Sequence, residues 1–204
     1  MNSILKPNYF RRVGPRKKTP RRALGLTLLA VLLIGGAVRS AAQTQAVDEY
    51  TLKASFLTLF PQYTSWPSNM LTGSNAPVVI GVLGSDPFGP VLDQTALGQK
   101  GGPPLTVKRI TTLEEAAQCY VVFIAKTESR NEAAWLAALK DMPVLTVGES
   151  GQTIARGGAV EFKTEDKRIR FEINLPAVET AKLKISSLML AHASKVYRSA
   201  KSFP

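Results

Sequence analysis

The chain has 204 residues and a formal net charge of +11, with 26 lysine and arginine residues against 15 aspartate and glutamate residues. Nine of the basic residues and none of the acidic ones lie in residues 1–42, so 17 basic and 15 acidic residues remain in residues 43–204. A net charge of +2 over that part leaves no electrostatic footprint for a nucleic acid, and we expect no nucleic-acid partner. The single cysteine, Cys119, excludes an intramolecular disulfide.

Residues 1–42 have the layout of a secretory signal peptide. A basic region ends at Arg22, an apolar run covers residues 23–38, and small residues follow at 40–42. The apolar run is short for a membrane span and contains glycines. We therefore predict cleavage after Ala42.

Three alternatives for this leader remain open. They are cleavage after Ala46, an uncleaved N-terminal anchor, and a twin-arginine export signal at Arg21 and Arg22. In each case residues 43–204 leave the cytoplasm. Their length suits a single domain with a core of its own.

The first predicted element after the leader is a helix from Asp48 to Phe60. Leu52, Phe56 and Phe60 recur at helical spacing, Tyr63 continues the stripe, and Pro61 ends or bends the helix. The aromatic residues of this segment, with Trp66, either pack in the core or form a groove for a partner's apolar side chain. The sequence leaves both interpretations open.

Strands and helices then alternate along the chain. Apolar runs predict strands at 78–83, 120–125 and 144–147, and a further strand is expected at 105–110. Helices are expected from a cap at Asp86 to Leu97, at 112–118 and at 129–141. This order predicts an α/β fold: a mixed, largely parallel sheet flanked by helices on both faces, with a C-terminal β-hairpin and helix.

Residues 160–173 predict a two-stranded ribbon at an edge of the sheet. Apolar and charged residues alternate, and a turn at Glu165-Asp166 would pair Phe162 with Ile169 and Glu161 with Arg170. One face is then apolar and packs on the core, and the charged face meets water or a partner.

Residues suited to catalysis or metal binding do not form a recognisable set. Gly81, Gly84 and Gly89 lie between a strand and a helix, but their spacing differs from the dinucleotide-binding motif. Ser150 and the only histidine, His192, give a weak hydrolase hypothesis, because the G-x-S-x-G elbow is missing. One histidine and one cysteine give no metal-ligand cluster. We therefore predict no catalytic residue, no metal and no cofactor.

A small-molecule-binding sensor module is one candidate function. Ligands of open parallel sheets bind outside the carboxyl ends of the strands. Those ends lie near Gly84 and Ser85 and near Gly148 and Glu149, so we expect any ligand pocket at these four residues.

Five segments in order resemble the YfiR/HmsC family of periplasmic regulators, and together they cover nearly all of the chain after the leader. They are DEYTLKASFLTLFPQYTSWP, VVIGVLGSDPFGPVLDQ, CYVVFIA, PVLTVGES and GGAVEFKTEDKRIRFEINLPAVETAKLKISSLMLAHASKVYR. The resemblance implies a mixed sheet between helices, a periplasmic location and no catalysis.

The resemblance also implies partners. The expected one is the periplasmic sensor domain of an inner-membrane diguanylate cyclase, or of another sensor protein, which the chain would repress, lowering cyclic di-GMP and with it exopolysaccharide and biofilm formation. An outer-membrane lipoprotein that sequesters the repressor, and a second copy of the chain, are further candidate partners. For partner contacts we expect the charged face of the ribbon, with Arg168, Arg170 and Glu172, and Asn174.

The chain departs from the family pattern in its cysteines and in its first helix. Many relatives have a cysteine where this chain has Gly81, and the disulfide partner of that cysteine matches Cys119. A second cysteine pair is also missing, so control by disulfides is not carried over. Pro61 stands where relatives continue the first helix, which we expect to be bent here.

Overall fold

The computed structural model describes residues 49–68, 76–166 and 168–199. The chain divides into two units, residues 1–43 and 44–204, and all described residues belong to the second. The expected leader, its cleavage site and the expected start of the first helix at Asp48 lie outside the described residues. Within the described ranges, none of the helices has the length and apolarity that a membrane crossing needs.

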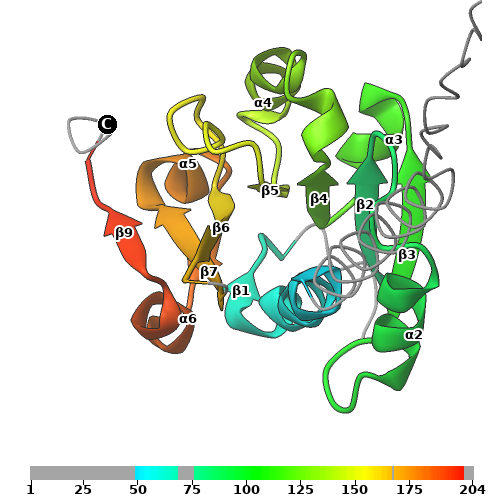
Figure 1. Cartoon of the computed structure of the whole chain (residues 1–204). Helices are drawn as coiled ribbons and strands as arrows, with labels where there is room; N and C mark the ends of the chain where they lie inside the picture. The colour runs from blue at the N-terminus through cyan, green and yellow to red at the C-terminus, as the bar shows by residue number, and fades with distance from the viewer. Residues whose placement is uncertain (1–48, 69–75, 167, 200–204) are drawn as a thin grey trace, which may run out of the picture. The chain divides into compact units, whose positions relative to one another are not determined.

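Seven strands of the described residues form one sheet in the order β3-β2-β4-β5-β6-β7-β9 (Figure 1). Neighbours from β3 to β6 run parallel, β7 is antiparallel to β6, and β9 is parallel to β7. The predicted α/β class with a largely parallel sheet is confirmed. The strands are β2 (Val78–Leu83), β3 (Leu105–Ile110), β4 (Val121–Ile124), β5 (Leu145–Gly148), β6 (Val160–Glu165), β7 (Arg168–Asn174) and β9 (Lys195–Tyr197), and a separate pair joins β1 (Thr64–Ser65) to β8 (Lys184–Ile185).

Helices cover both faces of the sheet (Figure 1). The N-terminal helix, described over residues 49–59, packs with α2 and α6 against one face, and α3 and α4 pack against the other. The described helices are η1 (Phe60–Tyr63), α2 (Pro90–Gly98), α3 (Leu113–Ala117), η2 (Lys126–Glu128), α4 (Glu132–Leu139), α5 (Leu175–Thr180) and α6 (Ser187–His192).

The central strands are apolar throughout because both of their faces are covered. All residues of β4 and β5 are buried, as the continuous apolar runs predicted. Strands β2 and β3 have the predicted limits, and β4 and β5 differ from their predicted limits by one residue at each end. Thr112 caps α3 in a capping box with Glu115.

The predicted register of the ribbon is wrong by two residues. Phe162 is paired with Phe171, and Glu161 is paired with Glu172, so the expected Glu161–Arg170 pair does not form. Strand β7 begins at Arg168, which is paired with Glu165, and Asp166 lies in the turn with φ 49°. A shift of two preserves the side-chain faces, so the apolar face still packs on the core.

The ribbon is also not the edge of the sheet. Strand β9 pairs with β7 and covers its outer side. The chain reaches β9 through α5, β8 and α6, so the C-terminal region predicted as one helix is a mixture of short elements. Short apolar stretches do not distinguish a strand from a helix by periodicity, and this explains the missed strand.

The helix α2 begins later than predicted. Its N-cap is Gly89, with φ 54°, and not Asp86. The Asp86 carboxylate instead accepts a hydrogen bond from Phe88 N at 2.7 Å and pairs with Arg109. An aspartate can satisfy a local turn as readily as a helix end, and Asp86 does the former.

The N-terminal helix is rotated relative to the predicted stripe. Leu52 is 48% exposed, whereas Lys53, Ala54 and Leu57 are buried. A buried lysine at this place breaks the apolar pattern from which the stripe was inferred. At the end of the helix, Pro61 lies in the first turn of η1, so the backbone tightens there as the sequence indicated.

An aromatic cluster ties the N-terminal helix to the ribbon. The ring centroids of Phe60 and Phe171 lie 5.3 Å apart, those of Phe56 and Phe171 5.4 Å, and those of Phe60 and Phe162 5.9 Å. Aromatic pairs at such separations add about 0.5–1.5 kcal/mol beyond their buried area. The cluster joins two segments that are more than a hundred residues apart in the sequence.

Gly81 on β2 faces Cys119 in the apolar core between the sheet and the helices α3 and α4. A Cβ added to Gly81 would lie 2.8 Å from Cys119 Sγ and 2.8 Å from Ile110 Cδ1. The thiol of Cys119 is buried, and burial raises its pKa to about 11. Gly81, the position at which many relatives have a cysteine, therefore lies next to Cys119 in space.

The Gly81→Cys variant is expected to form a disulfide with Cys119. The missing Cβ already lies near the distance from Cys119 Sγ that a disulfide needs. Closing the loop between the two positions should stabilise the oxidised variant over its reduced form by about 4 kcal/mol. Urea unfolding with and without reductant measures the difference.

Gly81→Ala is the control, because its Cβ meets Ile110 without adding a thiol. It should be less stable than the wild type, with equal stability in both redox states. If both cysteines of unfolded, unreduced Gly81→Cys react with a thiol reagent, the pairing is excluded.

Candidate functional site

The residues expected to line a ligand pocket lie where the parallel strands end, but Gly84 and Gly148 face protein, whereas Ser85 is exposed. A Cβ on Gly84 would come within 2.8 Å of Thr127 and Glu128, and Ser85 N donates to Thr127 Oγ1 at 3.0 Å. Gly148 is closed in the same way by other side chains. Glu149 lines an open cavity.

Glu149 joins three segments of the chain. Its Oε2 accepts a hydrogen bond from Lys53 Nζ at 2.6 Å, and its Oε1 accepts from Lys126 N at 3.1 Å and from Tyr50 OH at 3.3 Å. Its side chain is 4% exposed, as is that of Lys53. The N-terminal helix and the chain after β4 are therefore both fixed to the chain after β5.

Lys53 lies between two carboxylates. Its Nζ is 2.5 Å from Glu49 Oε1 and 2.6 Å from Glu149 Oε2, and it lies 4.6 Å from the centroid of the Tyr50 ring. Burial raises the pKa of Tyr50, and the nearby charges of Glu149 and Glu49 raise it further. The phenol therefore stays protonated and donates to Glu149.

A second buried carboxylate, Glu132 of α4, holds the loop between β5 and β6. Thr153 Oγ1 donates to its Oε1 at 2.6 Å, and Ser150 Oγ and Arg156 Nη1 donate to its Oε2 at 2.5 and 2.6 Å. Glu161 accepts from Thr153 N at 3.1 Å on the other side of the same loop. Side chains from α4 and β6 thus determine the path of this loop.

The charged face of the ribbon is only partly exposed. Arg168 and Arg170 are exposed, and Glu172 is half-buried with Tyr197 OH donating to its Oε2 at 3.1 Å. Asn174 is buried, and its side chain accepts from Ala177 N at the start of α5. Asn174 therefore offers no surface to a partner, and the partner-contact proposal keeps the other three residues.

Glu161 corrects the expectation of a fully exposed charged face. It is buried, and its Oε2 lies 3.3 Å from Lys163 Nζ. The loop between β5 and β6 covers this part of the ribbon, a contact that the alternation of residues cannot reveal.

An apolar groove of about 270 Å³ opens between the N-terminal helix and α6. Leu59 is 37% exposed and Leu188 is 51% exposed. Phe60 belongs to both the core and the groove wall, so core packing is confirmed, and binding of a partner's apolar side chain in the groove stays a prediction. The groove is lined by Phe56, Leu59, Phe60, Tyr63, Phe171, Leu188, Met189 and His192.

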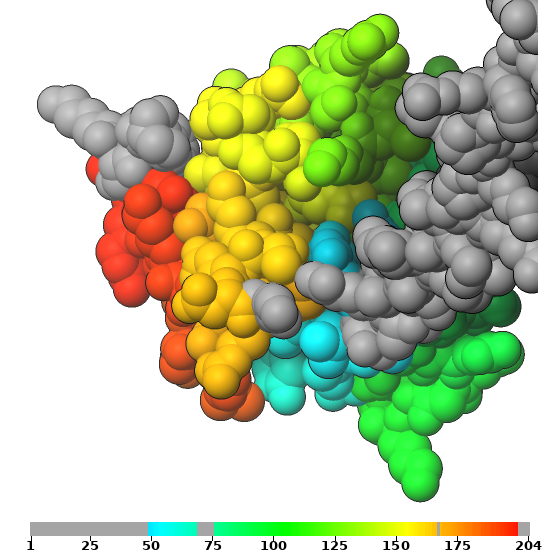
Figure 2. Space-filling view, viewed as in Figure 1, coloured from blue at the N-terminus to red at the C-terminus, as the bar shows by residue number. Residues whose placement is uncertain are grey.

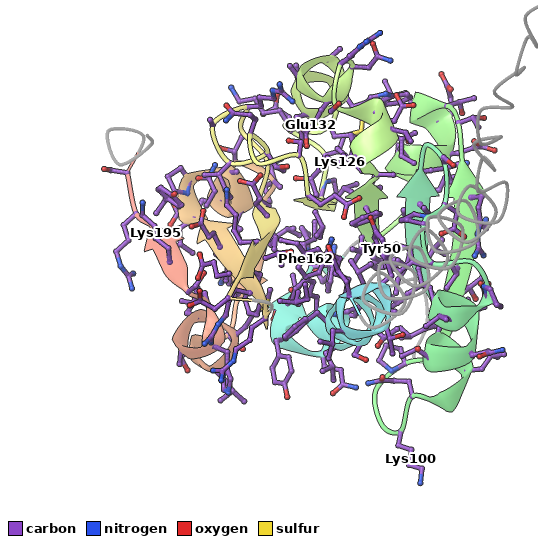
Figure 3. All side chains as sticks on the ribbon, viewed as in Figure 1. Tyr50, Lys100, Lys126, Glu132, Phe162 and Lys195 are labelled. Carbon is purple, nitrogen blue, oxygen red and sulfur yellow. The ribbon has the colours of Figure 1, made fainter. Side chains whose placement is uncertain are left out.

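A polar cavity of about 460 Å³ opens beside Glu149. Figure 3 shows Tyr50 and Phe162 in the middle of the molecule, with Lys126 above them on the side of Glu132. The cavity is lined by Glu49, Tyr50, Lys53, Lys126, Glu149, Ser150, Gly151, Phe162, Lys163 and Thr164. We call this the Glu149 cavity.

The residues of the weak hydrolase hypothesis lie in different sites. Ser150 bonds to Glu132, whereas His192 lines the apolar groove and its Nδ1 lies 2.8 Å from Leu188 O. Among the described residues, no three histidine, cysteine or acidic side chains come together as metal ligands.

Sequence reasoning missed the buried charges. Glu49 and Lys53 are four residues apart in a predicted helix, a spacing that suggests an ion pair but gives no sign of burial. Glu132 begins an otherwise apolar stretch, EAAWLAAL, and that was the one signal of an inward-facing carboxylate.

Lys53→Met is expected to destabilise the protein by about 3 kcal/mol or more, because Glu149 then stays buried without its charge partner. Adding Glu149→Gln should recover part of this loss by removing the unpaired charge. Urea unfolding of the wild type, both single variants and the double variant gives the coupling free energy.

Lys140→Met removes an exposed lysine at the end of α4 and should leave stability unchanged. Additive losses in the double variant would show that Lys53 and Glu149 do not depend on each other.

Comparison with known proteins identifies the family of the chain. The YfiR/HmsC-like family matches residues 50–194, which is more than half of the chain, and its members are periplasmic regulators. No curated protein matches the sequence. Among solved structures, a conserved domain protein from Vibrio cholerae is similar with 13% identity and a TM-score of 0.46, over 58% of this chain and 54% of that one. The chain belongs to the YfiR/HmsC-like family.

Proposed function

We propose that the protein is a periplasmic repressor that binds the periplasmic sensor domain of an inner-membrane signalling protein, a diguanylate cyclase. Family membership supports a regulatory role. The leader at residues 1–42 supports export and removal of the leader. The observation that carries the proposal is the apolar groove, because an open apolar surface of this kind marks a protein-binding site.

The groove has the composition of an interface core. On the N-terminal helix after Glu49, Thr51, Leu52 and Leu59 are exposed and Ser55 and Phe56 are half-buried, and none of these five residues is charged. Interface cores are depleted in charge and enriched in aromatic residues. We therefore assign the groove to an apolar side chain of the sensor domain.

The surroundings of the groove favour an acidic partner segment. Neither residues 50–76 nor residues 181–204, which contribute most of the groove, contain an acidic residue. Lys184 is exposed on β8, directly before α6. A partner with an apolar side chain flanked by carboxylates would bind here with complementary charge.

The charged side of the ribbon is a second contact surface in this proposal. Arg168 and Arg170 alternate with Ile169 and Phe171 along β7 and therefore lie on the opposite face of the sheet from the groove. Figure 2 shows the ribbon in yellow to orange, next to the C-terminal strand in red. Glu172 completes this surface.

Repression follows as a shift of population. A protein that binds only the inactive arrangement of the sensor domain lowers the active fraction by its difference in affinity for the two states. Cyclic di-GMP would fall, and with it exopolysaccharide and biofilm. An outer-membrane lipoprotein that binds the repressor would reverse the shift, and a second copy of the chain could occupy the same surface.

Leu188→Asp is expected to abolish capture of the membrane partner, because it places a charge in the groove. The test expresses the full chain with a C-terminal tag, purifies it from the periplasm, and identifies membrane proteins that co-purify. Mass spectrometry of the same sample shows whether the N-terminus begins after Ala42.

Leu97→Asp is the matched control, since Leu97 is 83% exposed on α2 and outside the groove. It should capture the partner as the wild type does. Arg168→Glu with Arg170→Glu tests the second surface. Equal capture by Leu188→Asp and the wild type would exclude the groove.

Deletion of the gene should raise cellular cyclic di-GMP, because the repressed cyclase becomes active. Complementation with the wild type should restore the low level, and Leu188→Asp should not. Mass-spectrometric quantification of cyclic di-GMP is the measurement. Unchanged levels after deletion would refute the cyclase as partner.

A further inference from the structure

We propose that the Glu149 cavity binds a small zwitterion, a free amino acid, through its ammonium and carboxylate groups. This goes beyond the proposed function and does not depend on the identity of the membrane partner.

The place of the cavity in the fold supports a ligand site. After β2 the chain moves to one side of the sheet to form β3, and after β4 it moves to the other side to form β5 and β6. The connecting helices change face at the same point, with α2 on one face and α3 and α4 on the other. Open α/β sheets bind ligands outside the carboxyl ends of the strands near such a switch point. Lys126 follows β4 there.

An incomplete strand ladder borders the cavity. Strand β6 pairs with β5 only at Val160 and Glu161, so Phe162, Lys163 and Thr164 have no β5 partner on that side. All three line the cavity. The edge of β6 therefore presents backbone donors and acceptors to a ligand, as the edges of other sheets do to peptides.

The walls of the cavity are built before any ligand arrives. Lys53 and Glu149 are more than nine-tenths buried and are held by direct hydrogen bonds and by Tyr50. Buried ion pairs rarely add net stability, so their presence at an open cavity points to a role in recognition. Fixed polar groups reduce the ordering cost of binding.

Charges of both signs line the cavity. Among the described residues, the carboxylates of Glu49 and Glu149 share the single ammonium of Lys53, which leaves an excess of negative charge. The ammonium of Lys163 shares Glu161 at 3.3 Å, and no hydrogen bond or ion pair with a described residue reaches that of Lys126. This leaves an excess of positive charge.

A zwitterion carries one charge of each sign and can therefore pair with both the carboxylates and the ammonium groups of the lining. Its ammonium would approach Glu49, which is the more exposed of the two carboxylates, and its carboxylate would approach Lys126 and Lys163. Phe162 gives its side chain an apolar wall. A volume of about 460 Å³ accommodates a free amino acid and lies within the usual range for ligand pockets.

The test is a thermal-shift screen of the purified protein against each of the proteinogenic L-amino acids. A ligand that binds only the native state raises the melting temperature, so at least one amino acid should do so. The N-acetyl and the amide derivatives of that amino acid, each lacking one charge, should give no shift. Calorimetry then gives the affinity.

Lys126→Met and Glu49→Gln should each weaken binding about tenfold or more, the cost of losing one charge-assisted hydrogen bond. Lys100→Met removes an exposed lysine far from the cavity in Figure 3 and should bind as the wild type does. The proposal fails if no amino acid shifts the melting temperature, if either blocked derivative binds equally well, or if both cavity variants retain wild-type affinity. Capture of the membrane partner by the wild type is unaffected by these outcomes, so the two proposals fail separately.

Discussion

The buried ion pair of Lys53 and Glu149 determines how the N-terminal helix packs against the chain that follows β5. The N-terminal helix would bury its other inward residues equally well in slightly different rotations, because apolar packing is not directional. A lysine that must reach one carboxylate at 2.6 Å fixes a single rotation. With that rotation set, Phe56 and Phe60 meet Phe171, and Leu52 and Leu59 are left in solvent. The exposed groove is therefore a consequence of a buried charge.

The same helix serves two different surfaces. Its first turns, with Glu49 and Tyr50, line the polar cavity, and its later turns, with Phe56 and Leu59, line the apolar groove. The polar cavity lies at the ends of strands β4 and β5, and the apolar groove lies on the aromatic face of the ribbon. The two surfaces therefore differ in chemistry. A single rigid element therefore connects a site suited to a small molecule with a site suited to a protein.

The central sheet could be predicted from the sequence because its signals are local. A continuous apolar run predicted β2 to the residue, β3 was also placed to the residue, and alternation predicted the faces of the ribbon. Register, the edge strand β9 and the burial of Glu161 could not be predicted, since each depends on contacts between distant segments. For the site, Glu149 was predicted at the end of β5. Its partners were not, because Lys53 lies 96 residues away in the sequence and reads as an ordinary charge on a helix.

The position of the N-terminal helix has a consequence for synthesis and export. This helix follows the leader directly, yet the rings that it packs against belong to β6 and β7. A chain that enters the periplasm with its N-terminus first cannot complete this core until Phe171 has arrived. Closing so long a loop costs entropy that no early contact repays. On an export route that moves the chain unfolded, it therefore crosses the membrane without a finished core, and until its last quarter emerges its aromatic helix is available to chaperones and proteases.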